Sequence, residues 1–128
     1  MKGFGEFIGE SKMEKIIIGG LEVWPEDLGK MTWDKANTEV AKLGPDWRLP
    51  TIEEFKKTLY RNKENLYITV GDAYWSSTEH DGLYGARTFN FSTGRVSTSG
   101  KFDNSAKYVY AVRDFTGAVA IEYLLKDF

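Results

Sequence analysis

The sequence predicts a single α+β domain built around an antiparallel sheet. Three observations lead to this fold class: two strand-like segments at the start, two segments of helical periodicity in the middle, and a series of strand-like segments in the second half. A chain of 128 residues is long enough for one hydrophobic core. The predicted order is therefore strand, helix, helix and then a run of strands.

The first strand-like segments surround a pair of glycines. Residues 16–18 are three isoleucines, residues 21–24 are mostly non-polar, and Gly19 and Gly20 between them are typical of a tight turn. Pro25 ends the second segment. Residues 1–15 are charged and rich in glycine, which predicts a flexible arm before a domain at 16–115. Residues 116–128 are interpreted as a C-terminal extension.

Residues 32–44 are predicted to form the first helix. Thr32 is suited to the N-cap, and non-polar residues recur at helical spacing as far as Leu43. Gly44 and Pro45 then end the helix, since glycine suits a left-handed C-cap and proline cannot continue the helix.

Residues 51–60 are predicted to form the second helix. Thr51 and Glu54 match a capping box, in which each side chain satisfies a backbone N–H that lacks an intrahelical partner. The helical pattern dissolves beyond about Asn62. The predicted buried stripe consists of Ile52, Phe55 and Leu59.

Short strands are predicted from residue 67 onward. The strand-like segments are 74–75, 88–91, 95–97 and 108–112, and residues 92–95 form a predicted hairpin turn. Residues 117–128 are compatible with a helix or a strand. We favour a helix, because their non-polar residues can share one helical face.

Composition excludes several classes of function. The chain has no cysteine, so it has no disulfide, thiolate metal site or cysteine nucleophile. The net charge is −2 without a block of like charge, which argues against nucleic-acid binding through phosphate neutralisation. No non-polar run predicts membrane insertion, and the first residues do not match a secretory signal.

Several short motifs follow one another in fixed order. They are Gly20-Leu21-Glu22-Val23, Thr32-Trp33-Asp34-Lys35-Ala36, Trp47-Arg48-Leu49-Pro50-Thr51, Tyr74-Trp75-Ser76-Ser77-Thr78, Phe91-Ser92-Thr93-Gly94 and Val112-Arg113. Together they resemble the bacterial domain family of unknown function DUF1566, and the resemblance covers roughly residues 16–113.

The resemblance implies a C-type-lectin-like fold, shared with formylglycine-generating enzymes and with the variable proteins of diversity-generating retroelements. It implies two helices packed on a twisted antiparallel sheet, with a loop-rich second half that presents the ligand-binding surface. It also suggests a cell-surface, secreted or phage-particle location, whereas the absence of cysteine allows the cytoplasm. No compartment is predicted.

The chain departs from the family pattern at a few positions. Val40 and Ala111 stand where many relatives carry cysteine, which suggests that packing replaces a covalent link. Tyr110 stands where relatives often have arginine, and Arg87 where an aromatic residue is common.

No metal, cofactor or catalytic site is predicted. His80 is the only histidine, and its neighbours Glu79 and Asp81 would point to opposite faces of an extended segment, so we interpret the three as a polar loop. The sugar-binding signatures of calcium-dependent lectins are missing. Ser76 and Ser77 lack a base, because the single histidine lies on the same segment. We therefore expect a protein that is not an enzyme.

A set of aromatic and charged residues is assigned to the structure rather than to binding. The tryptophans among them begin helices or strands beside non-polar neighbours, which favours core packing. The arginines are expected to bind backbone carbonyls or to pair with a carboxylate. The set consists of Trp33, Trp47, Arg48, Glu54, Trp75 and Arg113.

The candidate ligand-binding residues are polar or amphipathic side chains between residues 79 and 108. Tyrosine, serine, asparagine and arginine are the residues that adaptable binding surfaces use. The candidates are His80, Asp81, Tyr84, Arg87, Asn90, Arg95, Lys101, Asp103, Asn104 and Tyr108, with Ser97 and Thr98 beside them.

The sequence thus favours a non-catalytic module that recognises a protein or a glycan through its second half. The alternative is a structural or assembly domain of a bacterial or phage surface complex, forming homo-oligomers through its terminal segments.

Overall fold

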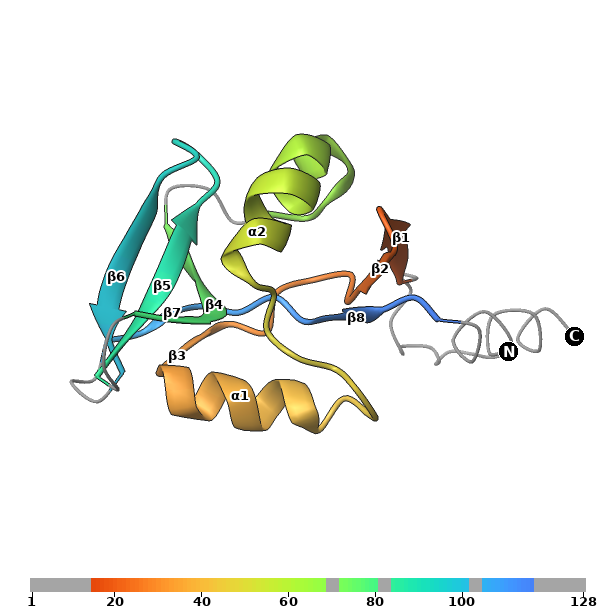
Figure 1. Ribbon diagram of the computed structural model, residues 1–128. Coiled ribbons are helices and arrows are strands. Elements are labelled where there is room, and N and C mark those ends of the chain that lie inside the picture. Colours follow the sequence, from red (N-terminus) through yellow and green to blue (C-terminus); the bar gives the residue numbers. More distant parts are fainter. Residues whose placement is uncertain (1–14, 69–71, 81–83, 102–104, 117–128) are drawn as a thin grey trace, which may run out of the picture.

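The computed structural model describes residues 15–68, 72–80, 84–101 and 105–116, and these form an α+β domain (Figure 1). Nearly all of the predicted N-terminal arm and C-terminal extension, including the helix expected at 117–128, lies outside the described residues. Within the described ranges, no helix has both the length and the non-polar composition needed to cross a bilayer.

One sheet joins the beginning of the domain to its end. Strands β1 (Ile16–Ile18) and β2 (Leu21–Val23) form the predicted hairpin around Gly19 and Gly20. Strand β8 (Val112–Asp114) pairs antiparallel with β2, so the order is β1-β2-β8.

The first helix, α1 (Trp33–Ala41), begins where the sequence predicts. The hydroxyl of Thr32 accepts a hydrogen bond from the Lys35 N–H at 3.4 Å, and Val40 lies on the buried face. This face packs below the strands, as Figure 1 shows.

The second helix begins with the predicted capping box and extends farther than predicted. Its first turn, α2 (Ile52–Glu54), is followed by a π-helical turn, η1 (Phe55–Leu59), and by a 3₁₀ segment, η2 (Tyr60–Asn65). The prediction that helical structure ends near residue 60 is wrong. A 3₁₀ segment repeats every three residues and so does not continue the 3.6-residue pattern that marked the helix in the sequence.

The second sheet contains five strands in the order β3-β7-β4-β5-β6. Its strands are β3 (Lys30–Met31), β4 (Ala73–Glu79), β5 (Gly85–Asn90), β6 (Val96–Gly100) and β7 (Lys107–Tyr108). Strands β4 and β7 pair in parallel, with Tyr74 opposite Tyr108. The expectation of a wholly antiparallel sheet is wrong at this pair, and the fold is α+β with mixed strand directions.

The segment predicted as one strand at 108–112 is divided between the two sheets. The carbonyl of Val109 accepts a hydrogen bond from Leu28 N–H at 2.8 Å, and that of Ala111 accepts one from Trp24 N–H at 2.9 Å. The backbone therefore bonds to the connection that precedes α1 before it enters β8. Burial on both faces explains why the segment is continuously non-polar.

Two hydrophobic clusters lie on opposite faces of the strands. Tyr74 belongs to the cluster beneath the second helix, and the next residue, Trp75, belongs to the cluster beneath α1. Successive strand residues point to opposite faces, so β4 contributes to both clusters. Val40 and Ala111 are both buried in the cluster beneath α1, at the positions where packing is expected in place of a covalent link.

Candidate functional site

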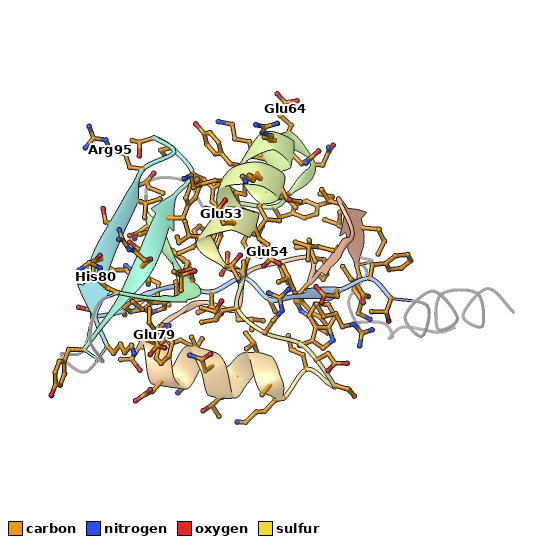
Figure 2. The ribbon with its side chains drawn as sticks, viewed as in Figure 1. Glu53, Glu54, Glu64, Glu79, His80 and Arg95 are labelled. Carbon is orange, nitrogen blue, oxygen red and sulfur yellow. The ribbon has the colours of Figure 1, made fainter. Side chains whose placement is uncertain are left out.

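The predicted ligand-binding residues do not gather in one place. Figure 2 shows Arg95 near one end of the β5–β6 hairpin and His80 near the other end. Both are exposed, and Tyr84 is 76% exposed. Asp81, Asp103 and Asn104 lie outside the described residues.

Lys101 is not a surface residue, contrary to expectation. It is only 4% exposed, its ammonium group pairs with the Glu79 carboxylate, and its Nζ lies 4.3 Å from the centre of the Trp33 ring. Its backbone N–H also donates to the carbonyl of Tyr84 at 2.9 Å. Lys101 therefore ties the start of α1 to the ends of β4 and β6.

Asn90 and Tyr108 also make structural contacts. The Asn90 Oδ1 atom accepts hydrogen bonds from the N–H groups of Ser92 at 2.7 Å and Thr93 at 3.2 Å, which shapes the hairpin turn. The ring of Tyr108 packs against that of Tyr74, with 5.6 Å between their centres. The amide oxygen of Asn90 and the ring of Tyr108 therefore support the fold.

A groove lies between the second helix and the β5–β6 hairpin, and we call it the hairpin groove. Its volume is about 370 Å³. The helix contributes three of its lining residues, and β4, β5 and β6 contribute one each. The lining residues are Ile52, Glu53, Lys56, Thr78, Arg87 and Val96.

The hairpin groove carries two positive charges without a partner in the described part of the chain. Neither Lys56 nor Arg87 makes an ion pair or a side-chain hydrogen bond with a described residue. The one carboxylate of the groove, that of Glu53, lies 3.1 Å from the Lys57 ammonium. The groove therefore favours an anionic group, with Ile52 and Val96 as apolar contacts.

The walls of the hairpin groove are held by hydrogen bonds beneath it. The Thr78 hydroxyl accepts from the Ile52 N–H at 3.0 Å, which joins β4 to the start of α2. The Ser76 hydroxyl donates to the Arg87 carbonyl at 2.8 Å. Arg87 thus extends from a backbone that is fixed before any ligand arrives.

A second hollow, of about 360 Å³, lies beside η2 and the end of β5. Its floor is apolar, formed by residues that include Leu66 and Phe91. Its charges differ in sign, because Lys63 and Glu64 both line it, and the Lys63 ammonium lies 4.4 Å from the centre of the Tyr60 ring. This hollow has no net preference for one charge.

Arg48 forms the predicted ion pair with Glu54. Two N–H···O bonds of 2.8 Å join the guanidinium to the carboxylate, and a third of 3.0 Å reaches Asp114. Burial alone would raise the pKa of Glu54, but the hydrogen bonds from Arg48 and from the Thr51 N–H outweigh it and lower the pKa. The hydrogen bond to Glu54 raises the pKa of Arg48.

Arg113 is buried and pairs with an acid that the sequence did not indicate. Its Nε lies 2.5 Å from the Glu22 Oε1 atom, and its guanidinium carbon lies 4.8 Å from the centre of the Trp47 ring. Glu22 is 1% exposed. Such a pair is costly to break, because either partner alone would be a buried, uncompensated charge.

The tryptophans line the cluster beneath α1. Trp47 and Trp75 are buried, whereas Trp33 is only partly buried and packs against that cluster. The indole N–H of Trp75 donates to the Met31 carbonyl at 2.8 Å, and that of Trp33 to the Ser76 carbonyl at 2.9 Å. Their polar atoms are therefore used within the fold.

No group of three or more histidine, aspartate or glutamate side chains that could hold a metal ion occurs among the described residues. The expectation that the chain binds no metal, uses no cofactor and is not an enzyme stays a prediction.

Most of the hairpin groove was missed by reasoning from sequence, which identified only Arg87. Lys56 follows Phe55 and lies four residues after Ile52, so it borders the buried stripe of the helix. That position was a usable signal. The sequence does not show which strands pack beside this border of the helix, and so it does not place Lys56 in a groove.

The family model described as the Lcl C-terminal domain matches residues 18–113, which is most of the chain. The chain belongs to this family. The Lcl C-terminal domain family is the DUF1566-related family that the sequence motifs indicate. No curated protein matches the chain. The matched range contains every residue of the hairpin groove.

Proposed function

We propose that this Lcl C-terminal domain is a non-catalytic binding module with a C-type-lectin-like fold, and that it takes an acidic group of a protein or a glycan into the hairpin groove. The observation that carries the proposal is a pair of cations, Lys56 and Arg87, which have no ion-pair partner among the described residues and share the groove with apolar side chains. A carboxylate or sulfate group placed between them would receive charge-assisted hydrogen bonds, each contributing about 1.5–3 kcal/mol.

The arrangement of the groove supports this role. Its cations come from a helix and a strand whose backbones are linked through Thr78 and Ser76, so little ordering is needed on binding. A rigid scaffold that carries exposed charged side chains separates stability from recognition. The alternative assembly role rests on the terminal segments, which lie outside the described residues, and stays a prediction.

The test is a binding screen followed by two matched variants. Glycan and peptide arrays carrying sulfate, carboxylate or neutral groups are probed with the purified domain, and the strongest acidic binder is titrated by calorimetry. We expect Arg87→Ala to weaken that binding at least tenfold, or about 1.4 kcal/mol. Added salt should weaken it as well, because exposed charges are screened.

Arg95→Ala is the control, because Arg95 is exposed on the same hairpin and does not line the groove. It should change the affinity less than twofold, and thermal melts should show that both variants fold. An equal loss of affinity in Arg87→Ala and Arg95→Ala would contradict the proposal. Preferential binding of neutral probes would contradict it as well.

A further inference from the structure

Strand β6 lies at the edge of the five-stranded sheet. It pairs with β5 on one side, and no described strand pairs with its other side. Figure 1 shows β6 at the outer border of the domain. Its free side therefore offers backbone hydrogen-bonding groups to a partner.

The residues that offer these groups can be identified from the register. Asn90 N–H bonds to the Arg95 carbonyl at 3.0 Å, and Lys101 N–H bonds to the Tyr84 carbonyl at 2.9 Å. In an antiparallel pair, bonded and non-bonded positions alternate. The unbroken register between these two bonds therefore directs the backbone groups of alternate β6 residues away from β5. The outward-directed residues are Val96, Thr98 and Gly100.

The residues of β6 lack three features that commonly prevent pairing at an edge strand. Proteins protect an edge with proline, a charged residue or a bulge. The strand reads Val-Ser-Thr-Ser-Gly, with no proline or charge, and its pairing with β5 is regular over all five residues. An extended segment can therefore align along its whole length.

The hairpin groove indicates which side chain an extended segment paired with β6 would carry. Arg87 lies opposite Thr98 in the register, on the face that also carries Val96 and the groove. A strand added beyond β6 would lie two strand spacings, roughly 10 Å, from β5. An arginine and a glutamate side chain together span this distance, so an acidic residue on the groove face can meet Arg87.

We propose that the partner is an extended polypeptide that adds to β6 as a sixth strand and places an acidic side chain in the hairpin groove. This inference rests on the proposed function, and it narrows the partner from a protein or glycan to a polypeptide strand. Main-chain hydrogen bonds to β6 supply affinity, and the groove selects the acidic side chain.

The probe is a blocked seven-residue peptide of alternating threonine and valine with a central glutamate, labelled for fluorescence anisotropy. A second peptide carries glutamine at the centre. Two further peptides are methylated at alternate backbone nitrogens. One carries the methyl groups at its odd-numbered residues and the other at its even-numbered residues. Only one of these sets can face β6, so each is the control for the other.

On the protein, Thr98→Pro removes an outward N–H and leaves the hydrogen bonds to β5 in place, and Thr98→Ala is its matched control. We expect Thr98→Pro to weaken the glutamate peptide at least tenfold and Thr98→Ala less than twofold. One methylated peptide should lose binding and the other keep it. Arg87→Ala should weaken the glutamate peptide and leave the glutamine peptide unchanged.

Equal binding of the two methylated peptides, measured on the unaltered protein, would overturn the inference even if Thr98→Pro failed to fold. Acidic glycans that bind through Arg87, together with peptides that do not bind, would leave the proposed function standing and overturn strand addition. Failure of every acidic probe, glycan and peptide alike, would overturn both.

Discussion

Arg48 joins three parts of the chain through its guanidinium. It bonds to Glu54 at the start of the second helix and to Asp114 at the end of β8, and its own backbone pairs with Val112. The side chain of Glu54 also accepts from the Thr51 N–H at 2.9 Å. One carboxylate thus fixes a helix start and an interstrand contact together.

The Arg48–Glu54 pair makes stability depend on acid pH. The folded state lowers the pKa of Glu54 below its ordinary 4.5, so the pair stabilises the fold fully above that value and loses its effect as the pH falls through the folded pKa. We expect Glu54→Gln to cost about 1–3 kcal/mol at pH 7. The cost should shrink as the pH falls below 4.5.

Urea melts of both proteins between pH 7 and pH 3 measure this difference. Glu53→Gln is the matched control, because the Glu53–Lys57 pair is exposed and an exposed helical pair contributes less than about 0.5 kcal/mol. A cost for Glu54→Gln that is independent of pH would show that the charge of Glu54 does not stabilise the fold.

At the scale of elements, the hairpin rests on the second helix through one close contact. Gly94 has a φ of +74°, and a Cβ built there would lie 3.1 Å from the Tyr60 ring. The same ring meets Phe89 edge to face, with 5.4 Å between centres. The turn of the hairpin is therefore seated on η2, which keeps the groove walls together.

Gly94→Ala is expected to destabilise the domain more than Gly29→Ala. Both residues have positive φ, which costs an alanine about 1–2 kcal/mol, but nothing lies within 4 Å of the position of a Cβ at Gly29. Overpacking against Tyr60 should add about 1–3 kcal/mol at Gly94. Denaturant midpoints of the two variants measure the difference. An equal loss of stability in both variants would show that the Tyr60 ring moves aside without a free-energy cost.

The elements that the sequence predicted well are those defined by local chemistry. Thr51 and Glu54 predicted the helix start, and Gly19 and Gly20 predicted the first turn, because caps and turns depend on neighbouring residues. The parallel pairing of Tyr74 with Tyr108 could not be predicted, because it depends on which distant strands meet.

The candidate site was predicted less well than the fold for the same reason. Residues from the predicted surface, such as Lys101, proved to have partners within the domain, since the sequence does not show which side chains face one another. Arg87 was identified, whereas its neighbour across the groove, Lys56, depends on the packing of a helix against a hairpin.

At the scale of the whole molecule, the two hydrophobic clusters share their strands and should unfold together. All four tryptophans belong to or pack against the cluster beneath α1, whereas Phe55 lies in the cluster beneath the second helix. Residues 109–111 alternate between the clusters, as Tyr74 and Trp75 do. Loss of one cluster therefore removes a wall of the other.

Phe55→Leu tests this coupling. The ring of Phe55 stacks on that of Phe89 with 5.3 Å between centres, and its loss should cost about 1–2 kcal/mol. We expect the midpoint reported by tryptophan fluorescence to fall together with that reported by far-UV circular dichroism. A fluorescence midpoint that stays at the wild-type value would show that the two clusters unfold independently.

The pairing of β2 with β8 also determines the order in which the domain can be completed. Glu22 precedes Arg113 by 91 residues, and synthesis proceeds from the N-terminus, so the buried carboxylate is made long before its guanidinium. Until β8 arrives, the first sheet has only the two strands β1 and β2, and a two-stranded hairpin is marginal in water by itself. A nascent or prematurely terminated chain that stops short of Arg113 cannot close the first sheet. Incomplete copies of the domain therefore do not reach the folded state and remain open to proteolysis.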